Sequence, residues 1–217
     1  MFAYPKQAEF NRIVSKDIIY KKAKPSNAIK KRFVSEVREI VWQYKLSKDT
    51  INLIPKDGLT EIQVFKITLK SLELSRDVLR VIDKAIPYPI FYRLIFEDRI
   101  NRAASYKHVR GKDVDNCVVG DYFETGWGDA TAPEMQLPVA LNLKFLYEQM
   151  MVLYIGLRIR DNETLEELVE RAQNIRRKQR ELQALEAKMA REKQFNRKVN
   201  INAQIRDINA ELAALMD

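Results

Sequence analysis

The residues best suited to catalysis are a group of carboxylates in the middle of the chain. They are Asp113, Asp115, Asp121 and Glu124. Carboxylates that converge on one pair of strands can hold the metal ion of a nuclease. Asp121 and Glu124, however, are three residues apart on a segment that we expect to be extended, so their side chains should point to opposite faces. The sequence therefore predicts no metal site and no cofactor, and a divergent metal-dependent nuclease stays an alternative hypothesis.

Nucleophilic, redox and nucleotide chemistry have even less material. The sequence contains one histidine, His108, and one cysteine, Cys117. These counts exclude sites built from several imidazoles, a disulfide framework and a cysteine-built zinc site. With six glycines, no segment resembles a P-loop or a dinucleotide fingerprint. We therefore predict no catalytic residue and favour a binding protein over an enzyme.

Positive charge is concentrated in two segments of the chain. Residues 1–46 contain eleven Lys and Arg against four Asp and Glu, and residues 171–198 contain ten against three. On an ideal helix the second group forms a row along one side, which is the arrangement that phosphate binding requires. The candidate nucleic-acid-binding residues are Lys30, Lys31, Arg32, Arg176, Arg177, Arg180, Lys188 and Arg191.

The C-terminal region also carries an apolar seam at alternating steps of three and four residues, and it has neither Gly nor Pro from residue 165 onward. This spacing is typical of a helix that packs along its length against another helix. The segment is either one continuous helix or a hairpin that turns near residues 194–202. In both cases the seam must be buried by its own second half, by another copy or by a partner. The candidate partner-docking residues are Leu168, Ile175, Leu182, Phe195, Ile205, Ile208 and Leu212.

The rest of the chain must position these residues, and its patterns alternate between helix and strand. Ser26 is a helix N-cap, and apolar residues at helical spacing predict a helix from there to Tyr44. Thr164 and Glu167 form a capping box at the start of the C-terminal helix. We expect irregular structure in the first 24 residues, strands at 61–69, 90–96, 100–106 and 116–124, and helices that begin after Ser75 and at Pro138.

This order predicts an α+β fold with a small mixed β-sheet covered by helices. A long C-terminal helical extension, coiled coil or helical hairpin, would follow it. We place the α+β domain at residues 1–160 and the extension at residues 161–217.

Several segments of the chain resemble a bacterial and archaeal family described as domain of unknown function 4391. The resemblance spans nearly the whole chain. It implies a setting beside helicases and DNA methyltransferases in restriction-like defence clusters, and it implies no catalytic residues. The segments that carry it are 10–16 (FNRIVSK), 61–70 (EIQVFKITLK), 81–87 (VIDKAIP), 118–124 (VVGDYFE), 137–141 (LPVAL) and 192–199 (EKQFNRKV).

Taken together, these features favour an accessory interaction subunit of a DNA-targeting complex, with phage-defence or restriction-like activity. Its C-terminal helices would dock onto a helicase or methyltransferase partner, or onto a second copy. The alternative is a protein that binds DNA or RNA directly, without sequence specificity, through its basic helix faces. The chain has no apolar stretch long enough for a membrane span and no signal-peptide pattern, so we expect a soluble cytoplasmic protein without a membrane partner.

Overall fold

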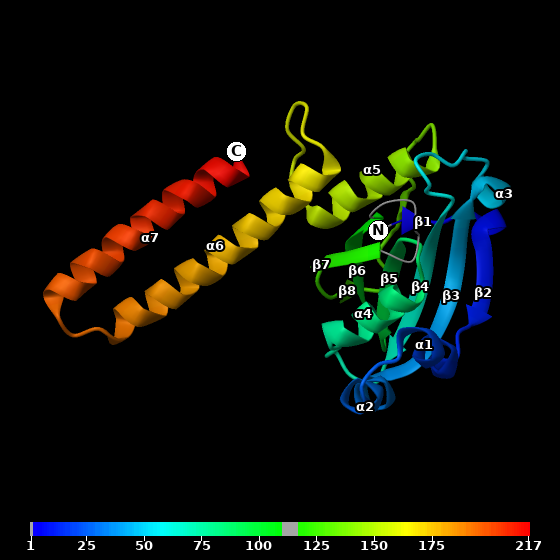
Figure 1. Ribbon diagram of the computed structural model, residues 1–217, viewed down its shortest axis with the longest axis horizontal. Coiled ribbons are helices and arrows are strands. Elements are labelled where there is room, and N and C mark those ends of the chain that lie inside the picture. Colours follow the sequence, from blue (N-terminus) through cyan, green and yellow to red (C-terminus); the bar gives the residue numbers. More distant parts are fainter. Residues whose placement is uncertain (1, 110–116) are drawn as a thin grey trace. The chain divides into compact units, whose positions relative to one another are not determined.

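The protein is described by a computed structural model in which residues 2–109 and 117–217 are placed (Figure 1). The chain divides into two compact units, Met1–Tyr154 and Ile155–Asp217. Among the described residues, no helix combines the length and the apolar character needed to cross a membrane.

The first unit is built on a mixed seven-stranded sheet with the order β2-β3-β4-β5-β6-β7, and a short strand, β8, also pairs with β6. Strands β4 and β5 are parallel, and the other neighbours are antiparallel. A separate parallel pair joins β1 (Phe2–Ala3) to β9 (Met135–Gln136). The strands of the sheet are β2 (Glu9–Ile13), β3 (Val37–Ser47), β4 (Glu61–Leu69), β5 (Ile90–Phe96), β6 (Arg99–Val109), β7 (Cys117–Glu124) and β8 (Gly128–Asp129).

Helices cover both faces of this sheet. The helices α1 (Lys16–Ala23), α2 (Asn27–Glu36) and α4 (Arg76–Ala85) pack their apolar sides into one core with the strands. On the opposite face, α5 (Leu143–Ile155) places Tyr147 and Tyr154 against Phe91 of β5. The short helices η1 (Lys6–Ala8) and α3 (Lys48–Ile51) complete the unit.

Two expectations for the N-terminal part were wrong. The helix that begins at Ser26 ends at Glu36, and Val37–Ser47 is a strand paired on both sides. Its apolar residues are β-branched or aromatic and are buried on both faces of the sheet, so the spacing imitated a helix. The first 24 residues also contain helix α1, which Ser15 caps by accepting a hydrogen bond from the Asp17 N–H.

The remaining elements follow the predicted order. Strand β4 has the predicted bounds, α4 starts after Ser75, and the Thr164–Glu167 capping box is present at the start of α6 (Leu165–Arg191). The predicted fold class is therefore confirmed: a mixed sheet covered by helices, with a long helical C-terminal extension.

The second unit resolves the alternatives for the extension in favour of a hairpin. Helix α6 ends at Arg191, and α7 (Phe195–Met216) runs back along it (Figure 1). The turn lies at residues 192–194. Its direction is antiparallel, because Arg171 near the start of α6 donates a hydrogen bond to the carbonyl of Leu215 near the end of α7.

Candidate nucleic-acid interface

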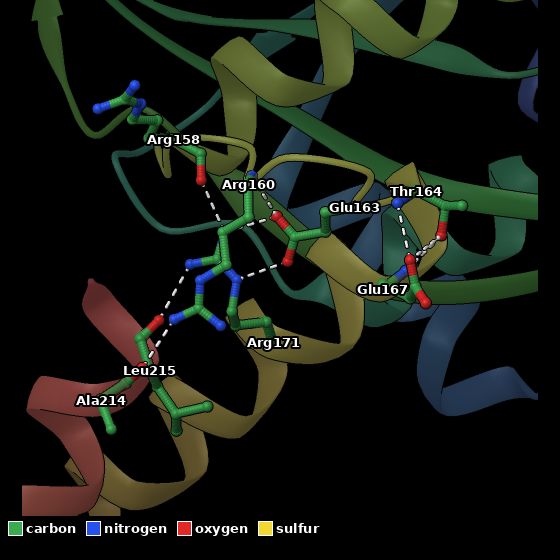
Figure 2. A network of polar contacts seen from close by, with 8 residues as sticks. All are labelled: Arg158, Arg160, Glu163, Thr164, Glu167, Arg171, Ala214 and Leu215. Atoms are coloured by element: carbon green, nitrogen blue, oxygen red, sulfur yellow. Dashed lines mark hydrogen bonds and ion pairs between the residues drawn. The ribbon is translucent and has the colours of Figure 1, made fainter.

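A buried arginine closes the open end of the hairpin (Figure 2). The guanidinium of Arg171 pairs with both carboxylate oxygens of Glu163, at 2.6 and 2.8 Å. It also donates to the carbonyls of Arg158 and Leu215, at 2.6 and 3.0 Å. A second arginine, Arg160, donates to the carbonyl of Ala214. Two cations thus satisfy carbonyls in the last turn of α7, where the helix dipole favours positive charge.

The other end of the hairpin is built by Glu192. Its carboxylate accepts hydrogen bonds from the backbone N–H groups of Lys193 and Gln194, each at 2.9 Å. These hydrogen bonds hold the pKa of Glu192 below its ordinary value. Because the charged carboxylate shapes the turn, it fixes where the cations that follow it are presented.

The outer side of α6 presents a row of four exposed cations, Arg177, Arg180, Lys188 and Arg191, which we call the basic stripe. Their spacing places them opposite Ile175 and Leu182, the residues that face α7. The stripe extends over about 20 Å at ~1.5 Å per residue. Ala184 and Ala187 leave a shallow hollow of about 330 Å³ beside Lys188 and Arg191.

The turn continues the positive surface and adds an aromatic side chain. We call Lys193, Phe195, Arg197 and Lys198 the hairpin tip, and all four are exposed. Phe195 is 78% exposed. Arg197 reaches Glu192 at only 3.8 Å, with 67% of its side chain exposed. The tip and the stripe thus form one surface rich in cations, with one unpacked aromatic ring.

The other predicted nucleic-acid candidates are less uniform. Arg176 is half-buried. On α2, Lys30 lies over the ring of Tyr20, 5.7 Å from its centroid, and Arg32 pairs with Asp77 at 3.1 Å, whereas Lys31 is exposed. Of the eight predicted cations, five are therefore open to solvent without a specific contact given for their charged groups: Lys31 and the four residues of the basic stripe.

The predicted partner-docking residues are mostly inside the hairpin unit. Ile175, Ile208 and Leu212 form its buried core, with Leu182 packed against them. Leu168 and Ile205 are also buried, whereas Phe195 is exposed. The second half of the extension therefore covers the seam, which was one of the three possibilities that the sequence left open.

The predicted carboxylates are engaged by arginines of α4. Asp121 lies 3.5 Å from Arg80, and Glu124 lies 3.2 Å from Arg76. Asp113 and Asp115 lie outside the described residues. Within residues 2–109 and 117–217, no three His, Cys, Asp or Glu side chains come together as metal ligands.

Sequence reasoning missed a buried ion pair in the first unit. Lys107 of β6 and Asp83 of α4 lie 2.8 Å apart, and each side chain is 1% exposed. Lys107 also donates to the carbonyls of Ile86 and Tyr88, and the Tyr122 hydroxyl donates to Asp83. Burial, with Asp83 beside it, raises the pKa of the Tyr122 hydroxyl. The available signal was an aspartate among the apolar positions of α4.

A cavity of about 500 Å³ lies at the N-terminal end of α4, with Trp127 and Asn101 in its lining. Its charged groups serve one another. The Glu36 carboxylate accepts the Ser75 N–H at 2.7 Å, and Glu124 accepts from both Arg76 and Asn101. The arrangement therefore stabilises the helix start and leaves no charged group that calls for a ligand.

The fold and this surface define a mixed α/β protein that carries a basic helical hairpin. The chain belongs to the family described as a domain of unknown function, DUF4391, whose model matches residues 2–212. No match was found among curated proteins or among solved structures.

Proposed function

We propose that this protein binds nucleic acid directly, and that the basic stripe and the hairpin tip contact the sugar–phosphate backbone. One observation carries the proposal: the hairpin buries its apolar seam internally and turns its cations outward. Phosphate contacts by Lys and Arg supply most of the affinity of non-specific nucleic-acid binding. The binding is without base sequence preference, since the stripe offers no bidentate base-reading side chains such as Asn or Gln between its cations.

The exposed ring at the tip fits the same role. A phenylalanine surrounded by Lys193, Arg197 and Lys198 offers a face on which an unpaired base can stack. In a protein that stays in water, such a side chain gains nothing from exposure. Phe195 is thus expected to contribute to affinity for single strands more than for duplexes.

The test is a quadruple variant, R177Q/R180Q/K188Q/R191Q, in a fluorescence anisotropy titration with a labelled 20-base-pair DNA duplex. At 50 mM salt we expect its affinity to fall by about 10- to 100-fold. The slope of log K against log salt should become shallower by roughly 3 to 4, since each lost phosphate contact removes about 0.9.

A matched control removes the same charge elsewhere. Lys6, Lys48, Lys56 and Lys84 are exposed and lie in the first unit, so K6Q/K48Q/K56Q/K84Q lowers the net charge equally. Its affinity should stay within about threefold of the wild type. Equal losses in both variants, or no binding by the wild type at 50 mM salt, would refute the proposal.

A second candidate function is docking onto a protein partner, as an accessory subunit of a DNA-targeting complex. It is favoured by an apolar surface in the first unit. Val139 is 94% exposed and Leu141 85% exposed, and Ile54 and Phe145 are exposed too. The segments are held together, since Ile54 bridges to Asn142 and the Asn142 side chain accepts the Phe145 N–H. Exposed apolar patches of this kind mark interaction sites.

The partner for this surface is the helicase or methyltransferase subunit that the family resemblance implies. With that subunit co-expressed, the variant V139D/L141D should lose co-purification, while the charge-matched variant K48E, on the exposed surface, should retain it. Persistence of the complex in V139D/L141D would exclude this surface.

A further inference from the structure

We infer that a second nucleic-acid contact lies on the first unit, on the outer surface of the α1–α2 helix pair. The inference deepens the proposed function, because it names a further surface for the same class of ligand. Its lysines were not among the predicted candidates, apart from Lys31, because residues 1–24 were expected to be irregular. The helix-pair surface comprises Lys21, Lys22, Lys24, Lys31 and Arg38.

The two helices form a compact pair joined by a short turn. Lys24 ends α1 in the left-handed conformation, with φ of 47°, and Ser26 caps α2 by accepting the Ile29 N–H. Tyr20 of α1 packs edge-on against Phe33 of α2, with 5.3 Å between ring centroids. Since the apolar sides meet the core, the lysines of both helices are left on the outside.

The local charge is strongly unbalanced. Residues 16–38 contain eight Lys and Arg and only two acidic residues, Asp17 and Glu36. Glu36 is engaged by the Ser75 N–H, and the one acidic partner from a neighbouring element, Asp77, is taken by Arg32. In the described part of the chain, none of the five cations of the helix-pair surface forms an ion pair of the kind that Arg32 makes.

Three other cations of this segment show what a structural role looks like. Lys16 donates to the carbonyls of Phe33 and Val37, at 2.9 and 2.7 Å, and burial lowers its pKa. Lys30 covers the Tyr20 ring, and Arg32 pairs with Asp77. Lys21, Lys22, Lys24 and Lys31 have no such task, and all four are exposed. Clustered like charges repel, so the fold retains them at a cost that a polyanion would relieve.

A nucleic-acid backbone fits this surface better than an anionic membrane. Helices that lie on a membrane insert a broad apolar face. Here the apolar faces are turned inward: Ile19 is 1% exposed and Phe33 is fully buried. Only Ile18 and Val34 are exposed apolar side chains on the two helices. The surface therefore offers charge without an insertable face.

The test compares three full-length variants with the wild type in binding to a 20-base-pair DNA duplex. K21Q/K22Q/K31Q removes three charges from the helix-pair surface, at exposed positions where glutamine preserves helix formation. K48Q/K56Q/K84Q is the control with equal net charge. The stripe variant R177Q/R180Q/K188Q/R191Q reports on the hairpin separately. Circular dichroism of each variant establishes that its helices are retained.

We expect K21Q/K22Q/K31Q to lower affinity about 10-fold at 50 mM salt and to reduce the salt slope by roughly 2 to 3, with the control unchanged. Unchanged affinity of K21Q/K22Q/K31Q with a weakened stripe variant would overturn this inference and leave the proposed function standing. The opposite pattern would support the inference and overturn the role of the hairpin. Binding to vesicles with 30% phosphatidylserine as tight as to DNA would also overturn the inference, in favour of a membrane.

Discussion

The ion pair between Lys107 and Asp83 is the residue-level feature that most constrains the first unit. The Lys107 ammonium joins β6 to the carbonyls that follow α4, and Asp83 receives both this cation and the Tyr122 hydroxyl. Placing charges in a core is costly unless each charge is paired and its remaining hydrogen-bonding capacity is used. Here the lysine has several acceptors, so the pair stabilises one particular packing of α4 on the sheet.

Removing one member of this pair should be far worse than removing both. K107M leaves Asp83 buried without its counter-ion, and we expect a loss of about 3–5 kcal/mol in the free energy of unfolding. D83L should cost a similar amount, because it strands the lysine. The double variant K107M/D83L should lose less than the sum of the two single losses, since no lone charge remains. Urea unfolding of the four proteins measures this coupling, and additive losses would contradict it.

Glu163 makes the stability of the hairpin depend on pH. Hydrogen bonds from Arg171 lower the pKa of Glu163 from its ordinary value of 4.5. A carboxyl with a lowered folded-state pKa contributes stability above its unfolded pKa and loses that contribution as pH falls through the folded pKa. We therefore expect the wild type to lose stability below about pH 4.5 more steeply than E163Q. Thermal unfolding between pH 3 and pH 7 measures this difference, and parallel curves would show that the pair contributes nothing.

At the scale of elements, the hairpin separates two kinds of apolar side chain that look alike in the sequence. Ile208 and Leu212 are buried between α6 and α7, whereas Phe195 is open to solvent. Burial at the seam stabilises the pairing of the two helices. The tip contributes surface chemistry, and its aromatic ring adds nothing to the core.

This difference predicts opposite effects of alanine substitution. I208A or L212A should lower the free energy of unfolding by about 2–4 kcal/mol, because each removes methyl groups from a packed core. F195A should change it by less than about 0.5 kcal/mol, as is usual for exposed positions. Thermal or urea unfolding compares the three variants. A destabilisation by F195A comparable to that of L212A would mean that the tip is packed against something else in solution.

The helical pattern also explains where element prediction failed. The apolar residues from Val37 to Tyr44 have helical spacing, yet they form β3, because strands on both sides supply partners for the backbone. Such pairing is a long-range interaction, and local spacing cannot report it. The same oversight concealed α1, and with it three of the lysines on the helix-pair surface.

At the scale of the whole molecule, charge dominates. The net charge is +8, and it is concentrated in two segments that belong to different compact units. A protein of this kind attracts polyanions over distances of a Debye length, about 10 Å at 0.1 M salt. Binding should therefore weaken steeply as salt is added.

The salt dependence can be stated as a number. If the four cations of the basic stripe each neutralise one phosphate, the affinity for duplex DNA should fall about 100-fold between 50 and 200 mM salt. Titrations at four salt concentrations give this slope for the wild type. Affinity that is independent of salt would point to apolar or base-specific contacts and would contradict a role for the stripe.

The sequence by itself determined the class of fold, the helical C-terminal extension with its capping box, and the concentration of positive charge, because caps, periodicity and composition are local properties. It could name the seam and the stripe, since both repeat every three to four residues along one helix. Only the tertiary structure decided that α7 covers the seam, that Arg32 is neutralised by Asp77, and that Lys107 meets Asp83 in the core. Each of these depends on contacts between residues more than 20 positions apart, and the free energy of such contacts is set by packing and desolvation, which no local pattern encodes.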